Sequence, residues 1–572
     1  MISRRSFLVG AGGAALAAAA LPGSARAQTL TGSARARTAF GVNWNQLSSH
    51  LQGQLVLPSD ANYPTAKLVY TAQFDGINPG AIAYCTSPAD VALCLGFAQD
   101  NALPFAARSG GHSAGGYSLS PGLVIDVSGL NSVTLANGTA TIGPGAELVD
   151  ITNTLAPAGL AISGGYCPTV AAGGFLQGGG IGLFTRTMGI ACDSVTSVQV
   201  VLADGNVVTA SPQQYSDLYW ALRGGGGGNF GIVTSYTFTP TPLTFIDVAL
   251  LTWPYDQALD VVNGWTQWLV DGPSTIGGGL NVTLADSAPG NVPTVSLILA
   301  CTDVSTGFGT EISRLVSLVG DSPASQVTLT APYEAIMMSQ YNCADLTEAQ
   351  CHLSGSSSVA ELPRPAFGLE RGRMFNGPIP RAGWANALAV FDTARLAGQE
   401  HLFQVTALGG TANNLPRAAT AYVHRDTLFM ANYICENAVG PVPNEAVAAG
   451  TQFVDAGFAA LNPYSNGESY QNFIDPRLPD WARSYYAENY FRLMQVKSVY
   501  DPYNAFRFAQ SIRLSGRNSG TQRRTCRPIL ACHDAPRSCL SGGHSGMGRN
   551  CGFSPSRRHV AEQYLPSSVA ET

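Results

Sequence analysis

Two glycine-rich stretches constrain this chain more than any other feature of its sequence. The first, residues 108–131, has Gly-Gly pairs before and after His112 and then enters the apolar run LVIDV. The second, residues 162–182, has a Gly-Gly pair just before Cys167 and further glycine groups after it. Consecutive glycines let the backbone take positive φ and approach a ligand closely, at an entropic cost that a plain loop has no reason to bear. We therefore predict that the two stretches form one ligand site from distant parts of the chain.

The residue types around these glycines indicate what the ligand is. Successive backbone N–H groups in such turns form anion-binding concavities suited to a pyrophosphate. Arg108 and Ser109 add a cation and a hydroxyl donor. His112 is a nucleophile when neutral, and Cys167 is one when ionised. Either residue alone is more often an ordinary turn residue, but the two together suit covalent attachment of a cofactor.

Several other classes of protein are excluded by what the sequence lacks. No glycine group forms the G-x-G-x-x-G fingerprint of a Rossmann fold or the G-x-x-x-x-G-K-[ST] of a nucleotide triphosphatase. Neither H-E-x-x-H nor paired C-x-x-C occurs in the core, so we predict no metal site. A net charge of −6 gives no indication of nucleic-acid binding. A chain with 64 glycines and only 12% charged residues fits a large globular enzyme that contains β-structure.

The motifs R-S-G-G-H-S and G-Y-C-P-T-V, followed by G-G-G-I-G, resemble the berberine-bridge-enzyme-like family of FAD-linked oxidases. The resemblance implies an α+β fold of the vanillyl-alcohol-oxidase/p-cresol-methylhydroxylase type. It has a two-part FAD-binding domain and an antiparallel-sheet substrate domain with helices on one face. It also implies bicovalent FAD, with His112 bonded to the flavin 8α-methyl and Cys167 to C6. The further residues that it assigns to cofactor binding are Arg108, Ser109, Gly110, Gly111, Ser113, Gly165, Val170, Gly174, Gly231, Val233, Asn472 and Asn504.

The N-terminus is predicted to be a targeting segment. Residues 1–27 contain S-R-R-S-F-L, which resembles a twin-arginine signal, then an Ala-rich apolar run and an A-R-A cleavage site. The apolar run is shorter than the roughly 20 residues that a transmembrane helix needs. An ordinary N-terminal anchor helix is the alternative. We expect a bacterial protein that is periplasmic or secreted, with the twin-arginine export machinery as a partner and no membrane contact after the signal is removed.

The rest of the chain divides into four zones. Residues 60–240 are expected to form the first part of the FAD domain, residues 241–430 the substrate domain, and residues 431–512 a C-terminal return to the FAD domain. Residues 513–572 match no family pattern and carry Cys526, Cys532, Cys539 and Cys551. We expect this tail to be disordered, or the product of read-through after a frameshift, and dispensable. Cys343 and Cys351 are close in sequence, but their pairing cannot be deduced.

Local patterns predict the following elements. Helices are expected at residues 88–99, 147–156, 216–222, 311–319 and 384–396. Strands are expected at 103–107, 198–202, 207–209, 232–238, 295–300 and 402–408, and Asn137-Gly138 and Asp204-Gly205 are hairpin signals. The five glycines at 224–228 are interpreted as a tight turn that re-enters a strand rather than a linker, and the resemblance implies that the backbone near residues 231–233 approaches the adenine end of FAD.

The candidate general base is Tyr470. It stands in Y-Q-N-F-I-D, which resembles the family's Y-x-N-Y/F-x-D segment, and residues 501–512 resemble its closing D-P-x-N-x-F-R-x-x-Q-S-I motif. A phenolate suits this role if the site lowers its pKa from the unperturbed value of about 10. The second candidate is His424, although a structurally satisfied histidine is its commoner interpretation.

The expected reaction is oxidation of a small molecule by FAD. A substrate C–H lies over flavin N5, a base takes the hydroxyl proton, and electrons pass to O2 to give H2O2. In the family, a valine at the position of Val170 goes with oxidases, and larger residues there slow the reaction with oxygen. The substrate is an alcohol, an oligosaccharide or a secondary metabolite. Oxidative cyclisation or desaturation, and a flavin-bearing binding protein with little turnover, remain open as alternatives.

Overall fold

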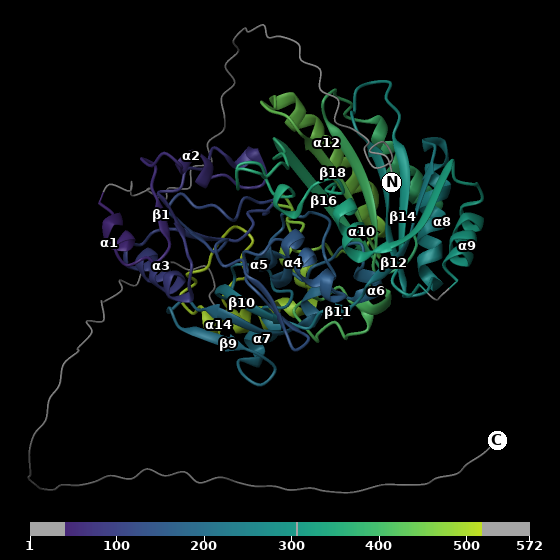
Figure 1. Ribbon diagram of the computed structural model, residues 1–572. Coiled ribbons are helices and arrows are strands. Elements are labelled where there is room, and N and C mark those ends of the chain that lie inside the picture. The colour runs from purple at the N-terminus through teal and green to yellow at the C-terminus, as the bar shows by residue number, and fades with distance from the viewer. Residues whose placement is uncertain (1–40, 305–306, 517–572) are drawn as a thin grey trace, which may run out of the picture. The chain divides into compact units, whose positions relative to one another are not determined.

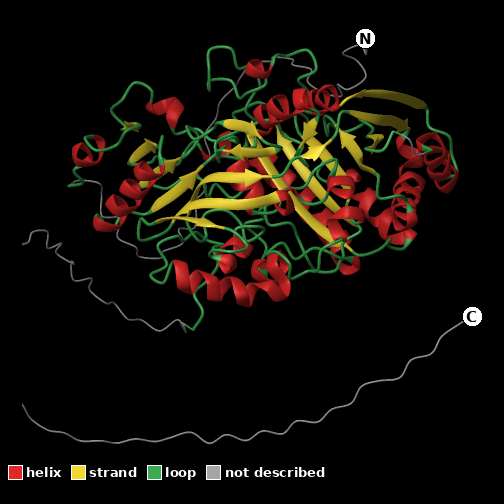
Figure 2. Ribbon diagram, turned by 60° about the horizontal axis from the view of Figure 1, so that its bottom comes forward, coloured by secondary structure: helices red, strands yellow, loops and turns green. Residues whose placement is uncertain are grey.

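The computed structural model describes residues 41–304 and 307–516. The predicted signal segment 1–27 and nearly all of the tail 513–572 lie outside the described residues. No helix in the described part of the chain is long and apolar enough to cross a membrane. Figure 1 shows the described elements, and Figure 2 shows their strands and helices from a second direction.

Two sheets form the FAD-binding part. The first has the order β1 (Gln54–Val56), β2 (Ala81–Tyr84), β4 (Leu123–Asp126), β3 (Phe105–Arg108), with β2, β4 and β3 parallel. The second is antiparallel, with the order β5 (Val133–Ala136), β6 (Thr139–Ile142), β10 (Ile232–Phe238), β8 (Val195–Val201), β9 (Val207–Ala210). A short ladder joins β11 (Thr241–Pro242) to β7 (Leu160–Ala161).

Helices pack on these sheets and close their cores. They are α1 (Trp44–Ser48), α2 (Tyr63–Ala66), α3 (Pro88–Asp100), α4 (Leu148–Leu155), α5 (Ala172–Gln177), α6 (Thr185–Met188), α7 (Ser216–Ala221), α13 (Trp481–Tyr486) and α14 (Tyr490–Tyr500). Residues of α13 and α14, together with Ile512, belong to the same apolar core as the five-stranded sheet. The C-terminal segment therefore packs on the FAD-binding part.

The third sheet is antiparallel and has seven strands. Its order is β15 (Ser325–Pro332), β12 (Phe245–Trp253), β14 (Thr294–Cys301), β13 (Ile276–Leu284), β17 (Glu400–Ala407), β18 (Phe429–Asn437), β16 (Phe367–Phe375). One face is covered by α8 (Ala258–Asp271), α9 (Phe308–Val319), α11 (Arg381–Ala389) and α12 (Asn444–Leu461), which share its apolar core. The predicted fold class is thus confirmed: α+β, with helices on one face of the substrate sheet.

The expected domain boundary at residue 430 falls inside β18, and the following α12 packs on β16 and β18. The substrate layer therefore extends through α12, because the apolar face of that helix completes the sheet's core. Helix α10 (Tyr333–Gln340) departs in the other direction. Its residues Tyr333 and Met337 belong to the core of the FAD-binding part, although they lie inside the expected substrate zone.

Most local predictions agree with the structure. Helix α3 begins after Ser87, whose hydroxyl accepts a hydrogen bond from the Asp90 N–H. Asn137 and Gly138 take φ of 52° and 73° in the turn between β5 and β6. The helix expected at 384–396 is wrong in position: α11 begins after Pro380 and ends at Ala389. A continuous helix cannot pass Ala394, whose φ is 54°.

The five-glycine segment is an ordered turn, as expected. The N–H groups of Gly224 and Gly226 both donate to the Gln177 carbonyl, at 2.8 and 3.0 Å. On the C-terminal side, the buried Lys497 ammonium donates to the Asn229 carbonyl at 2.8 Å and pairs with Asp501 at 2.9 Å. The C-terminal segment therefore holds the glycine turn in place through one buried ion pair.

Replacing Lys497 with Met should lower the free energy of unfolding by about 3–5 kcal/mol, because it leaves Asp501 buried without its partner charge. Urea unfolding followed by tryptophan fluorescence measures this change. The matched control is Lys67→Met, since Lys67 donates only to the Asp75 carbonyl and the Asn78 side chain near the surface. An equal loss in both variants would contradict a special role for the buried pair.

Candidate active site

One cavity of about 760 Å³ brings the predicted residues together. Both glycine-rich stretches, the 224–231 turn, the C-terminal return and the uncovered face of the substrate sheet line it. The predicted residues that line it are Arg108, Ser109, Gly110, Gly111, His112, Ser113, Gly165, Cys167, Val170, Gly174, Gly231, Val233, Tyr470 and Asn472. A volume of this size suits a cofactor-sized ligand.

Asn504 is the exception among these predictions, because it does not line the cavity. Its φ is 55°, and its N–H donates to the Asp501 carbonyl at 3.0 Å. Asparagine tolerates this left-handed conformation better than most residues. Asn504 is therefore a turn residue of the closing motif, and because its buried side-chain oxygen has no hydrogen-bond partner among the described residues, its contact with the cofactor stays a prediction.

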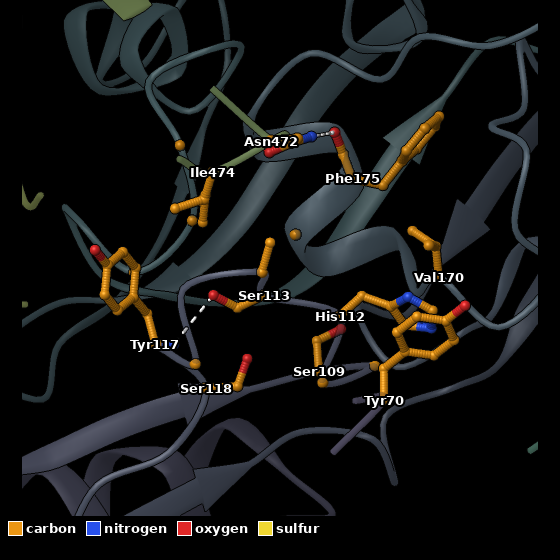
Figure 3. Close-up of a pocket in the computed structure, with 18 of the residues that line it drawn as sticks. Tyr70, Ser109, His112, Ser113, Tyr117, Ser118, Val170, Phe175, Asn472 and Ile474 are labelled. Atoms are coloured by element: carbon orange, nitrogen blue, oxygen red, sulfur yellow. Dashed lines mark hydrogen bonds between the residues drawn. The ribbon is translucent and has the colours of Figure 1, made fainter. Parts of the chain in front are cut away.

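The two glycine-rich stretches meet backbone to backbone. A Cβ atom at Gly110 would lie 2.8 Å from the Ala171 nitrogen and 3.0 Å from the Thr169 carbonyl oxygen, so only glycine allows this approach. His112 follows on one stretch, and its Nε2 lies 2.8 Å from Thr169 Oγ1 on the other. Figure 3 shows His112 and Val170 on the same side of the cavity.

The environment of His112 and Cys167 sets their protonation. Burial lowers the pKa of His112 to about 3, so its imidazole is neutral. Burial raises the pKa of the Cys167 thiol to about 11, so the free thiol keeps its hydrogen at neutral pH. In this state the histidine is nucleophilic and the cysteine is not.

At two glycines, the cavity lining leaves open space next to the backbone that FAD could occupy. A Cβ atom at Gly174 would meet nothing within 4 Å, and one at Gly227 nothing nearer than 3.8 Å. Both residues line the cavity, so added methyl groups there would fill space next to the bare backbone. Such a lining allows a ligand to lie directly against the main chain.

Buried polar atoms without partners give a second indication of the fit. Arg108 Nη1, Gln177 Oε1 and Gln510 Oε1 have no hydrogen-bond partner among the described residues, and all three side chains line the cavity. Buried polar atoms in folded proteins are normally paired, so these are candidate contacts for the hydrogen-bonding groups of FAD. Gln177 and Gln510 were not predicted, although Gln510 stands in the closing F-R-x-x-Q-S-I motif.

The charge of Arg108 is already balanced within the protein. Its Nε pairs with the Asp126 carboxylate on the neighbouring strand, and its Nη2 donates to Tyr84 at 3.4 Å. The role of Arg108 as a cation for the pyrophosphate stays a prediction, and its charge is shared with Asp126. Arg108 ties β3 to β4 and leaves one N–H for the cavity.

Tyr470 lies in the cavity wall and is almost fully buried. Its hydroxyl oxygen accepts hydrogen bonds from the Gly180 N–H at 2.8 Å and the Asn472 amide at 3.0 Å. Those two donors favour the phenolate, but burial is the larger effect and raises the pKa of Tyr470 well above its ordinary value. A general base at Tyr470 requires a pKa below the ordinary value for tyrosine. The protein residues alone do not provide that lowered pKa.

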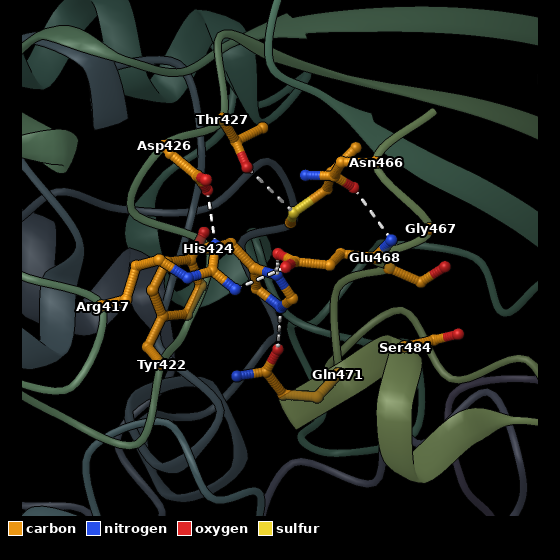
Figure 4. Close-up of polar contacts among 12 residues, drawn as sticks. Arg417, Tyr422, His424, Asp426, Thr427, Asn466, Gly467, Glu468, Gln471 and Ser484 are labelled. Atoms are coloured by element: carbon orange, nitrogen blue, oxygen red, sulfur yellow. Dashed lines mark hydrogen bonds and ion pairs between the residues drawn. The ribbon is translucent and has the colours of Figure 1, made fainter. Parts of the chain in front are cut away.

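His424 does not line the cavity and is fully buried. Its Nδ1 lies 2.7 Å from Glu468 Oε2, and its Nε2 lies 3.1 Å from Gln471 Oε1 (Figure 4). The Gln471 amide in turn donates to the Gly224 carbonyl at 2.7 Å. His424 is thus the satisfied structural histidine of the commoner interpretation, and it supports the glycine turn.

Three carboxylates on the substrate sheet were missed by sequence reasoning. Glu370, Glu400 and Glu436 line the cavity from β16, β17 and β18. Burial raises the pKa of Glu370 to about 8 and that of Glu400 to about 7, and it also raises the pKa of Glu436. Glu400 and Glu436 are cross-strand partners, so each disfavours ionisation of the other. Glu370 and Glu400 therefore exchange protons near neutral pH, which suits general acid–base chemistry.

The cavity defines a flavoprotein oxidoreductase, and comparison with known proteins gives its family. Residues 79–211 match the family model "FAD binding domain", and residues 469–513 match "Berberine and berberine like". The chain is 31% identical over 472 residues to the uncharacterized FAD-linked oxidoreductase YgaK of Bacillus subtilis, covering 81% of this chain and 97% of the relative. It is 29% identical over 480 residues to the xylooligosaccharide oxidase of Thermothelomyces thermophilus, covering 79% and 90%.

Solved structures show the same fold. Physcomitrella patens BBE-like 1 superposes with a TM-score of 0.73 at 24% identity, covering 83% of this chain and 99% of that chain. The protein belongs to the berberine-bridge-enzyme-like family of FAD-linked oxidoreductases. It is an FAD-linked enzyme, and the cavity residues described above fit that cofactor.

Proposed function

We propose that the protein oxidises a hydroxyl-bearing carbon of a small alcohol or sugar and passes the electrons to O2, giving H2O2. Bound FAD supplies the hydride acceptor and the route of electrons to oxygen. The observation that carries this proposal is the single cavity that joins the FAD-binding stretches to the polar, uncovered face of the substrate sheet. The relatives named xylooligosaccharide oxidase and chitooligosaccharide oxidase support a carbohydrate substrate.

The residues of the substrate sheet would position the substrate and receive its proton. Gln404, Leu402 and Ile434 line the cavity beside the carboxylates, so this face offers both hydrogen bonds and apolar contact. Tyr470 and Glu400 are the two candidate bases, from opposite parts of the wall. The base must be within hydrogen-bond reach of the substrate hydroxyl while the adjacent C–H faces the flavin.

Oxygen is the proposed acceptor because Val170 lines the cavity directly after the buried Thr169 and three residues after Cys167. Its carbonyl accepts the Leu148 N–H at 2.9 Å, which fixes the segment against α4. A valine side chain is one methylene shorter than that of leucine or isoleucine and leaves more room for dioxygen. The twin-arginine export of residues 1–27, and hence secretion, rests on the sequence pattern.

Anaerobic addition of candidate substrates tests the function. A panel of oligosaccharides, primary alcohols and phenolic metabolites should contain a compound that bleaches the flavin absorbance, and readmitted air should restore it with stoichiometric H2O2. Bleaching by a phenolic or alkaloid compound with ring closure or desaturation of the product would favour the alternative chemistry. If no compound reduces the flavin, a binding protein with little turnover becomes the better interpretation.

FAD should be attached through both His112 and Cys167. Acid-precipitated protein should stay yellow, and proteolysis should give one flavin linked to two peptides. His112→Ala should keep only the cysteinyl link, Cys167→Ala only the histidyl link, and the double variant should release free FAD. Wild-type protein that loses its flavin on denaturation would exclude covalent attachment.

Tyr470→Phe should lower the rate of flavin reduction by about 10²–10⁴-fold, the usual contribution of a general base. Flavin content should remain unchanged, as measured by absorbance, and stopped-flow spectroscopy gives the rate. The control is Tyr422→Phe, because the buried Tyr422 hydroxyl has no hydrogen-bond partner among the described residues and its ring packs against Tyr470.

The pH dependence separates the two candidate bases. A base must be deprotonated, and the raised pKa of Tyr470 means that its rate should still be rising at high pH. With Glu400 as base the rate should rise with pH and level off above about 7, where that carboxyl has lost its proton. Near-normal reduction by Tyr470→Phe together with a large loss in Glu400→Gln would move the role to Glu400.

A further inference from the structure

Tyr70 lies at the point where the two proposed attachment residues meet. It lines the cavity, and its backbone N–H donates to the Gly111 carbonyl at 3.2 Å, next to His112. The preceding residue is held from the other side, because Arg364 donates to the Val69 carbonyl at 2.7 Å. Arg364 also pairs with Asp75 at 2.8 Å. The backbone at Val69 and Tyr70 is therefore held by two hydrogen bonds to other parts of the chain.

The Tyr70 side chain contacts both His112 and Cys167. Its ring stacks on the His112 imidazole, with centroids 4.0 Å apart and planes inclined by 23°. Its hydroxyl oxygen lies 3.9 Å from Cys167 Sγ, within the range of a hydrogen bond donated by a thiol. Figure 3 shows the tyrosine ring beside the imidazole at the edge of the cavity.

These contacts restrict the orientation of the His112 imidazole and of the Cys167 thiol. The stacked ring fixes the plane of the imidazole, and the contact of Nε2 with Thr169 Oγ1 fixes its rotation. A hydrogen on Nε2 then leaves the lone pair on Nδ1 for bond formation. The thiol of Cys167 keeps its hydrogen at neutral pH, so the direction of its one hydrogen bond decides where the sulfur lone pairs point.

We propose that Tyr70 is a positioning residue for covalent flavin attachment, whose ring orients His112 and whose hydroxyl orients the Cys167 thiol. The proposal rests on the bicovalent attachment put forward under the proposed function. Formation of the sulfur–carbon bond removes the thiol hydrogen and one ring hydrogen of the flavin. Formation of the nitrogen–carbon bond would likewise remove the imidazole N–H hydrogen and one hydrogen of the 8α-methyl. For each bond, dioxygen would take the two hydrogens and the two electrons and leave as hydrogen peroxide.

Two substitutions separate the contributions of the ring and the hydroxyl. Tyr70→Phe keeps the stacked ring and removes only the partner of the thiol, so the histidyl link should persist and the cysteinyl link should be lost from most molecules. Tyr70→Ala removes both contacts, so both links should decline. Mass spectrometry of the flavin peptides measures the fraction of each link, and absorbance gives total flavin.

The matched control is Tyr63→Phe. Tyr63 lies in the same N-terminal segment and donates a hydrogen bond to the Pro79 carbonyl at 2.7 Å, but it does not line the cavity. This variant likewise loses one hydrogen-bonding tyrosine hydroxyl and should keep both flavin links at the wild-type level. Loss of the cysteinyl link in Tyr63→Phe as well would show a general loss of stability and would overturn the specific role of Tyr70.

The state of the flavin in wild-type protein separates the proposal of covalent attachment from the proposal that Tyr70 is a positioning residue. If wild-type protein carries both links and Tyr70→Phe carries them in the same proportion, attachment stands and the role of Tyr70 is wrong. If wild-type protein carries no covalent flavin, attachment and the role of Tyr70 both fail. Thermal unfolding of each variant, measured alongside, identifies any change that comes from misfolding.

Discussion

The site depends on the close backbone contact between the two glycine-rich stretches. Gly110 lies so near Ala171 and Thr169 that a single added carbon would overlap main-chain atoms. His112 follows two residues after Gly110, and Cys167 precedes Thr169 by two, so this contact fixes the distance between the proposed attachment positions. A packed core of side chains could not hold two backbones this closely, because every other residue carries a Cβ atom.

The seven-stranded sheet separates residues that build the core from residues that face the cavity. Alternate residues along β17 and β18 point to opposite faces. Phe403, Val405 and Tyr433 belong to the core beneath the helices, whereas Gln404 and Glu436 line the cavity. The FAD side of the cavity contains glycines from three separate stretches of the chain, and the sheet contributes side chains such as Glu370, Glu400 and Gln404. The residues that face the substrate side therefore come from a different layer than the glycine turns.

Elements with local signals could be predicted from the sequence. The hairpin at Asn137-Gly138 and the start of α3 at Ser87 depend on neighbouring residues alone, and both agree with the structure. Predictions that depended on distant partners were less successful. Arg108 was predicted as a cation of the site, but the sequence did not indicate that Asp126 on the adjacent strand balances its charge. Tyr470 was expected to have a lowered pKa, but burial raises it.

The sequence by itself determined the fold class, the cofactor class and the glycine-rich part of the cavity wall, because short motifs such as R-S-G-G-H-S and G-Y-C-P-T-V carry that information locally. Only the tertiary structure decided that Tyr70 contacts both His112 and Cys167, and that three glutamates face the same cavity. A period of two along a strand shows which residues share a face, but not which face meets the cofactor. Burial, which sets the protonation of these groups, is a property of the surroundings that the packed chain creates.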